Sequence, residues 1–177
     1  ILDGEHSDKH FYINNGVHKI SDMTIQKGQA SWGGGAIDIY QNASVEISNV
    51  LFRENHARYG GAVNISSGGT DGPQVKFTHC QFIENLAEYR DDSDGTGGGS
   101  GGAVEYNVKK NSLVEFIRCS FIRNKAKAEG WRDIQGGAVA GWGKSNFVNC
   151  LFVGNEVRLE NGQLASNENG NYCSKTA

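Results

Sequence analysis

Two acidic residues stand at equivalent places in the sequence and are the strongest candidates for catalysis. Asp38 follows Gly34-Gly35-Ala36-Ile37, and Glu105 follows Gly101-Gly102-Ala103-Val104. If these segments stack two rungs apart, at about 4.8 Å a rung, the two backbones lie about 9.6 Å apart. Inverting glycosidases hold their acid and base about 6.5 to 9.5 Å apart. Asp38 and Glu105 therefore predict, as one alternative, a polysaccharide hydrolase or lyase.

The rest of that column of residues favours a simpler interpretation. Asn64 and Ala140 hold the same place after the two other Gly-Gly-Ala tetrapeptides, and no Lys or Arg accompanies them. A lyase would need such a residue as its base, and an anionic sugar would need it as a counter-charge. The competing prediction is a solvated acidic face that has no catalytic function.

Four aromatic residues are better candidates for binding. Each lies in a segment that leads towards a glycine pair, and hence in a loop along one edge of the stack: Trp32, Tyr59, Tyr89 and Trp131. Aromatic rings in loops commonly anchor sugars or protein partners. The alternative is that these rings cover the bends and shield the core.

The cysteines predict no metal site. Cys80, Cys119 and Cys150 share one column, either as buried free thiols or, at the spacing of stacked rungs, as partners in a disulfide. Cys173 lies in the C-terminal segment. No Cys/His spacing indicates zinc, and we expect no cofactor.

The longest insertion offers a weak alternative for calcium at Asp92 and Asp94. An EF-hand loop beginning at Asp92 would need an acid at its twelfth position, where Ala103 stands, so that motif fails. The default is a flexible, solvated loop over residues 88–100. Elsewhere, Asn42-Ala-Ser44 and Asn64-Ile-Ser66 match the acceptor pattern for N-glycosylation.

A repeat must position all of these residues. Two tetrapeptides, Gly-Gly-Ala-[Ile/Val] and Phe-x-x-Asn, occur four times each in strict alternation over residues 34–155. Between them the apolar residues alternate with polar ones, are interrupted by two polar residues, and then alternate again. This pattern is typical of short strands joined by a tight bend. A period of 3.6 residues is absent, so no long helix is expected.

Aligning the repeats predicts inward-facing columns of equivalent residues. One column is Ile20, Ile47, Phe77, Phe116 and Phe147; the next is Met23, Val50 and the three aligned cysteines; a third is Ile25, Phe52, Phe82, Phe121 and Phe152. A fourth column of alanines would form a tight corner: Ala36, Ala62, Ala103 and Ala138. The repeat asparagines would form an amide ladder at another bend: Asn55, Asn85, Asn124 and Asn155.

Composition limits the classes of partner. The chain has 177 residues, 25 of them glycine, and a net charge of -3. No dense stripe of Lys and Arg is apparent, so we expect no nucleic-acid partner. No apolar run is long enough for a transmembrane helix, so we expect no direct insertion into a membrane.

The alternating tetrapeptides resemble the polymorphic outer-membrane protein repeat of chlamydial autotransporters, which is recognised by GGA[ILV] and FxxN motifs. Both motifs are present here, as Gly34-Gly35-Ala36-Ile37 and Phe52-Arg-Glu-Asn55 first show. The resemblance implies a right-handed β-helix that is extracellular or carried on a cell surface. Adhesion, the known role of the chlamydial members, is the function that it implies.

The sequence therefore predicts an all-β chain, a right-handed parallel β-helix (solenoid) of about five to six rungs. We expect one β-helix domain over residues 1–159, and a loop or loosely packed last turn over residues 160–177. Because residues 1–28 read as an interior rung, we also expect a segment of a longer protein. The expected function is a non-catalytic adhesive or structural surface with a glycan or cell-surface protein as its partner. The alternatives are the polysaccharide-active enzyme and a structural subunit among other chains of an extracellular assembly.

Overall fold

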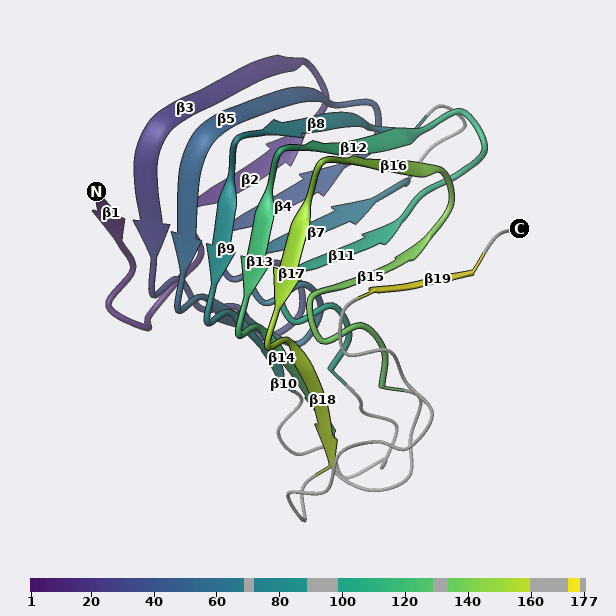
Figure 1. The fold of residues 1–177 in the computed structure, drawn as a ribbon. Coiled ribbons are helices and arrows are strands. Elements are labelled where there is room, and N and C mark those ends of the chain that lie inside the picture. The colour runs from purple at the N-terminus through teal and green to yellow at the C-terminus, as the bar shows by residue number, and fades with distance from the viewer. Residues whose placement is uncertain (69–71, 89–98, 129–133, 160–171, 176–177) are drawn as a thin grey trace.

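Parallel strands are the main elements of the described part of the chain. The computed structural model describes residues 1–68, 72–88, 99–128, 134–159 and 172–175. Within these ranges all paired strands are parallel, and no helix is long and apolar enough to cross a membrane. Figure 1 shows the strands stacked rung upon rung, with β1 at one end and β18 and β19 at the other.

Three sheets form the sides of the stack. The six-stranded sheet contains β2 (Phe11–Asn14), β4 (Ile37–Tyr40), β7 (Val63–Ser66), β11 (Val104–Asn107), β15 (Val139–Trp142) and β19 (Tyr172–Lys175). The nine-stranded sheet contains β1 (Leu2–Asp3), β3 (Val17–Gln26), β5 (Ser44–Arg53), β8 (Gln74–Thr78), β9 (Gln81–Ile83), β12 (Leu113–Ile117), β13 (Ser120–Ile122), β16 (Ser145–Val148) and β17 (Leu151–Val153). The four-stranded sheet contains β6 (His56–Ala57), β10 (Leu86–Glu88), β14 (Lys125–Ala128) and β18 (Glu156–Leu159).

This arrangement confirms the predicted all-β parallel β-helix. The chain visits the three sheets in turn and then starts the next rung, so every strand pairs with its equivalent in the neighbouring repeat. The six-stranded sheet agrees with the five to six rungs that the repeat predicts. Its last strand, β19, lies in the segment for which a loop or loosely packed last turn was expected.

Two columns of residues in the left-handed conformation form corners of the stack. Asn49 has a φ of 54° and bends the ten-residue strand β5, whose first half pairs with β8 and whose second half pairs with β9. Glu54 has the same φ and turns the chain towards the four-stranded sheet. Only one of the residues equivalent to these two is a glycine. The others adopt the left-handed conformation although it costs a residue with a side chain about 1 to 2 kcal/mol. The first column is Asp22, Asn49, His79, Arg118 and Asn149, and the second is Lys27, Glu54, Glu84, Arg123 and Gly154.

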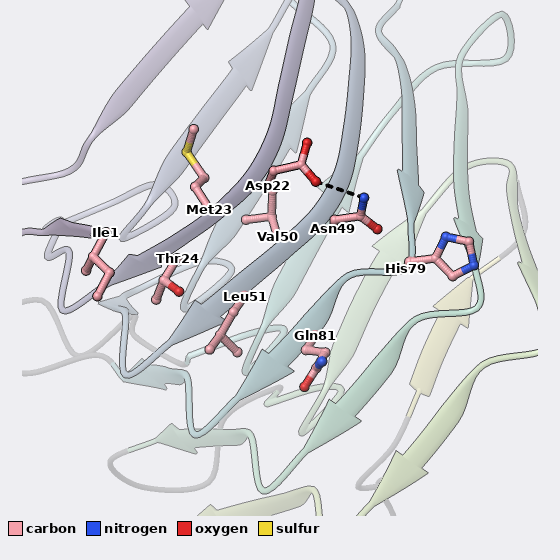
Figure 2. A pocket seen from close by; sticks show the side chains of 9 residues that line it. All are labelled: Ile1, Asp22, Met23, Thr24, Asn49, Val50, Leu51, His79 and Gln81. Carbon is pink, nitrogen blue, oxygen red and sulfur yellow. Dashed lines mark hydrogen bonds between the residues drawn. The ribbon is translucent and has the colours of Figure 1, made fainter.

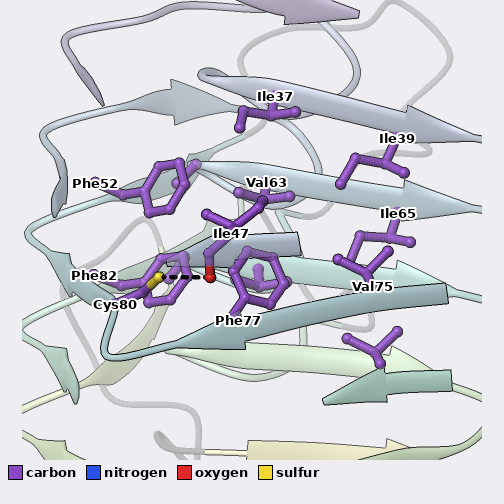
Figure 3. Close-up of a cluster of buried hydrophobic side chains, with 14 of the residues drawn as sticks. Ile37, Ile39, Ile47, Phe52, Val63, Ile65, Val75, Phe77, Cys80 and Phe82 are labelled. Atoms are coloured by element: carbon purple, nitrogen blue, oxygen red, sulfur yellow. Dashed lines mark hydrogen bonds between the residues drawn. The ribbon is translucent and has the colours of Figure 1, made fainter. Parts of the chain in front are cut away.

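The register confirms the predicted inward columns. Phe77 pairs with Phe116, and their rings stack at 5.0 Å with an interplanar angle of 3°. Phe82 and Phe121 stack at 4.8 Å in the third column, and Phe77 meets Phe82 edge to face. Figure 3 shows Phe77 and Phe82 among the aliphatic side chains of the core. Ring stacking at the rung spacing is thus a direct result of the register.

The asparagine column is an amide ladder, as predicted. The side-chain oxygen of Asn85 accepts from both the backbone N–H (3.1 Å) and the side-chain amide (3.0 Å) of Asn55. In the same way, Asn124 accepts from the backbone and side chain of Asn85. The Asn85 amide also donates to the carbonyl of Phe52 at 3.1 Å. Each buried amide is therefore satisfied by the rungs on either side of it.

The alanine column also lies where the sequence places it. Ala62 and Ala103 are fully buried, and the Ala62 N–H donates to the Ala103 carbonyl at 2.9 Å. The glycine pair before each alanine makes the corner sharp. Gly60 and Gly101 have φ values of 61° and 64°, and a Cβ on Gly60 would lie 2.0 Å from the Val63 carbonyl oxygen. Only glycine fits there without displacing the next strand.

Removing a central ring of the aromatic stack should test the core. We expect Phe121→Ala to lower the free energy of unfolding by about 3 to 5 kcal/mol, because Phe121 is fully buried between two stacked rings. Phe152→Ala is the matched control, since Phe152 is only partly buried. Urea denaturation of both variants measures the difference, and equal losses would contradict the placement of Phe121 in the interior.

The amide ladder gives a second stability prediction. Asn85→Ala removes the acceptor of two Asn55 donors, so we expect a loss of about 2 to 5 kcal/mol in the free energy of unfolding. Asn107→Ala, at an exposed strand position, should cost less than about 0.5 kcal/mol. Denaturant titration of the Asn85→Ala and Asn107→Ala variants measures both losses. A loss for Asn85→Ala that is no larger than the loss for Asn107→Ala would show that the ladder contributes nothing.

Candidate binding face

The outer side of the six-stranded sheet carries most of the side chains that could bind a ligand or take part in catalysis. Inward residues such as Ile37 and Ile39 are fully buried in the core. The residues between them point outward and stack in two columns set by the register. The first outer column is Tyr12, Asp38, Asn64, Glu105 and Ala140, and the second outer column is Asn14, Tyr40, Ser66, Asn107 and Trp142.

Asp38 points outward but is not solvated. Its side chain forms an ion pair with Lys9 and accepts hydrogen bonds from the Gly34 N–H at 2.7 Å and the Asn64 amide at 3.2 Å. The preceding loop closes over it, and a Cβ on Gly33 would lie 1.9 Å from the Asp38 Oδ1 atom. Asp38 is consequently only 1% exposed. The expectation of a solvated acidic face is therefore wrong here, because the glycine loop covers the start of the strand.

Glu105 lies two rungs further along the same column. Its Oε2 atom is shielded from solvent, and no donor among the described residues lies within hydrogen-bonding distance of that atom. Desolvation by burial raises the pKa of Glu105 to about 8, although the nearby Arg58 guanidinium opposes the rise. At neutral pH this carboxyl is therefore largely protonated.

The structure does not give Asp38 and Glu105 matched catalytic environments. Asn64 lies between them in the register, and it donates to Asp38. Asp38 is held by three donors and has almost no contact with solvent, so it is poorly placed to activate a water molecule. Glu105 is thus suited to donate a proton, whereas Asp38 holds the loop and the neighbouring rung together through its ion pair and hydrogen bonds.

Two predicted loop aromatics come together beside this column. The ring centroids of Trp32 and Tyr59 are 6.5 Å apart, and the Tyr59 N–H donates to the Trp32 carbonyl at 3.0 Å. The Arg58 guanidinium lies over both rings, 4.4 Å from the Trp32 centroid and 4.9 Å from that of Tyr59. Trp32 is 63% exposed, so one face of the group is open to solvent. The other two predicted aromatics, Tyr89 and Trp131, lie outside the described residues.

Sequence reasoning missed a second aromatic group, which lies on the strands themselves. The rings of Tyr12 and Tyr40 are 5.2 Å apart, and Tyr12 is 63% exposed. Burial, with Asp38 and Tyr12 nearby, raises the pKa of Tyr40. Trp142, in the second outer column, is 49% exposed. The signal was available: each of these residues falls on an outward position of the strand alternation.

The basic residues near the carboxylates were also missed. Lys9 lies before β2, and Arg58 follows β6, so neither belongs to the column that holds Asp38 and Glu105. Stacking of rungs brings them there from other segments. The absence of a cation in the column therefore did not mean the absence of one at the site.

The two glycosylation motifs differ in accessibility. Asn42 is exposed in the turn between β4 and β5, where a glycan has room. Asn64 is in the middle of the six-stranded sheet, and its amide nitrogen donates to Asp38. Asn42 is thus the better acceptor of the two.

The cysteine column consists of free thiols. Cys80 and Cys119 are interior free thiols, and Cys150 is a partly buried one. Their thiols donate to rung carbonyls, as Cys80 does to Ile47 at 3.5 Å. Within the described part of the chain, no three His, Cys, Asp or Glu residues are grouped as metal ligands. The weak calcium candidates, Asp92 and Asp94, lie outside the described residues.

Two grooves elsewhere on the surface have polar linings. One, of about 500 Å³, lies along the bend of the nine-stranded sheet. Figure 2 shows the side chains that line it, among them Asp22, Asn49 and His79. Asp22 accepts a hydrogen bond from Asn49 at 3.0 Å. The other groove, of about 660 Å³, is lined by ion-paired residues such as Arg123 and Glu84. Neither groove has a Phe, Tyr or Trp side chain in its lining, so the six-stranded sheet remains the better candidate.

No protein-family model, curated protein or solved structure matches the chain. What the protein binds must therefore be inferred from its own residues and geometry.

The buried carboxyl of Glu105 predicts how stability depends on pH. Its folded pKa of about 8 lies above the ordinary value of 4.5, so the folded state keeps a proton that the unfolded state releases. Stability should fall as the pH rises between these values, by at most about 1.4 kcal/mol per pH unit for one proton. Glu105→Gln cannot ionise and should flatten this slope.

Urea unfolding between pH 5 and pH 8 measures the slope, with the range taken from the pKa of Glu105. Glu46→Gln, which changes an exposed carboxylate on the nine-stranded sheet, is the control. If Glu105→Gln leaves the slope as steep as in the unaltered protein, Glu105 ionises normally and is not desolvated.

Proposed function

We propose that the chain is a non-catalytic, extracellular or cell-surface β-helix that binds a glycan on the outer side of its six-stranded sheet. One observation carries this proposal: exposed aromatic rings stand on rigid strands and adjoining loops of a single face. Tyr12, Trp32 and Trp142 are all at least 49% exposed there.

The arrangement suits sugars better than a protein surface. The C–H face of a sugar ring packs on an aromatic ring, while its hydroxyls bond to amides and hydroxyls alongside. In the second outer column Tyr40 and Trp142 are separated by Ser66 and Asn107, which supply such polar groups. A standard protein interface needs about 800 Å² per partner and an apolar centre. Small groups of rings between polar residues fit that requirement less well.

The sequence resemblance supports the same proposal. Adhesion is the known role of the chlamydial members of the repeat family that the Gly-Gly-Ala and Phe-x-x-Asn motifs resemble. A stacked core that supports a six-stranded sheet is a suitable scaffold for such a role, since each rung is held by its neighbours.

Hydrolysis of a polysaccharide is the second candidate, and one observation favours it. Glu105 is largely protonated at neutral pH, as a general acid must be. Asp38, its predicted partner, is buried and held by Lys9, Gly34 and Asn64. Binding without turnover is therefore the better supported function.

Loss of a ring from the face should weaken glycan binding. We expect Tyr40→Ala or Trp32→Ala to reduce the affinity for the best ligand of a glycan array by about tenfold, the loss of ~1.4 kcal/mol. Leu151→Ala, at an exposed site on the nine-stranded sheet, is the control and should bind normally. Release of reducing ends from bound glycan is measured in parallel.

The outcomes separate the candidates. Turnover that disappears in Glu105→Gln would establish the enzyme instead. Binding to cell-surface protein but to no glycan would replace the glycan with a protein partner. Equal affinity of the ring variants and the control would place the binding site on another face.

A further inference from the structure

Positive charge gathers at one corner of the proposed face. The turn between β11 and β12 carries Lys109 and Lys110, and the turn between β15 and β16 carries Lys144; all three are exposed. The two turns belong to neighbouring rungs, because the Val108 N–H donates to the Trp142 carbonyl at 2.8 Å. The two turns, with their three lysines, therefore lie side by side at the end of the six-stranded sheet (Figure 1).

This corner differs from others where lysines are paired. Lys9, Lys19, Lys125 and Lys127 each form an ion pair with a carboxylate. In contrast, no described carboxylate lies within ion-pair distance of Lys110 or Lys144. The corresponding turn of an earlier rung, residues 41–43, has amides and no charge. A net charge of -3 for the chain makes this local cationic cluster more distinctive.

An exposed indole borders the cluster. Trp142 is the last residue of β15, two positions before Lys144, and its neighbour in the register is Asn107 of β11. It is 49% exposed on the outer side of the sheet. An aromatic residue and an amide residue on the strands, and lysines on the turns that follow them, thus lie at the same edge of the face. A ligand that suits all three has an apolar ring face, hydroxyls and an acid group.

We propose that this corner makes the face selective for an acidic polysaccharide, whose sugar ring packs on Trp142 and whose acid groups face Lys110 and Lys144. The inference deepens the proposed function and rests on it. An ammonium is a compact charge that pairs with a carboxylate or a sulfate without fixed geometry, so both acids are suitable. Because the lysines are exposed, their attraction is screened by salt.

Matched polymers test the selectivity. Binding is measured by calorimetry for polygalacturonate against its methyl ester, and for dextran sulfate against dextran. We expect the acidic member of at least one pair to bind about tenfold more tightly. The advantage should shrink as ionic strength rises from about 0.01 to about 0.15 M, where the Debye length falls from about 30 to about 8 Å. A larger gain for polygalacturonate over its methyl ester indicates a carboxylate ligand. A larger gain for dextran sulfate over dextran indicates a sulfate ligand.

Substitutions test whether the selectivity arises at this corner. The double variant Lys110→Gln/Lys144→Gln should lose most of the preference for the acid form, and Trp142→Ala should weaken both forms. The control, Lys19→Gln/Lys76→Gln, removes the same charge from the nine-stranded sheet and should keep the preference.

Each outcome bears on one proposal. If acidic and neutral polymers bind equally, or if the control loses the preference as fully as the corner variant, the selectivity is overturned while glycan binding stands. If neither polymer of either pair binds, and no ligand is found on a glycan array, the proposed function itself fails. Loss of preference in the corner variant alone, with weaker binding in Trp142→Ala, supports the inference.

Discussion

Parallel hydrogen bonding between successive rungs is the constraint on which the whole molecule depends. It fixes each strand in register with its equivalents, so that a residue type repeated in the sequence becomes a column in space. The rings of Phe82 and Phe121 stack because their backbones are already one rung apart. The asparagine ladder then holds the corner where the chain leaves the nine-stranded sheet, and the buried amides tolerate no shift of register.

The sequence was sufficient to predict what depends on this register alone. The phenylalanine, alanine and asparagine columns follow from aligning the repeats, because identical spacing leads to identical placement. The left-handed corners were not predicted beyond the presence of a bend, since residues as different as His79 and Arg118 adopt that conformation. Their side chains give no local signal of the kind that glycine gives, and the stacked neighbours determine the angle.

The candidate site was harder to predict because its environment comes from several segments. Outward orientation of Asp38 follows from the alternation, but its burial depends on the loop through Gly33 and on Lys9. Glu105 likewise owes its raised pKa to packing that a single strand does not reveal. Alternation along a strand thus predicts the direction of a side chain, whereas its solvation depends on which loops cover the strand.

The order of rungs along the stack also determines how the protein would respond to mechanical load. β1 and β18 lie at opposite ends, and the strands run across the axis that joins them (Figure 1). A pull along that axis would load the hydrogen bonds of the end rung first and open them one after another, as in a zipper. Each released rung would add a long piece of extended chain while the remaining rungs stayed intact. Under tension such a β-helix would lengthen stepwise and dissipate work, keeping most of its outer face in place.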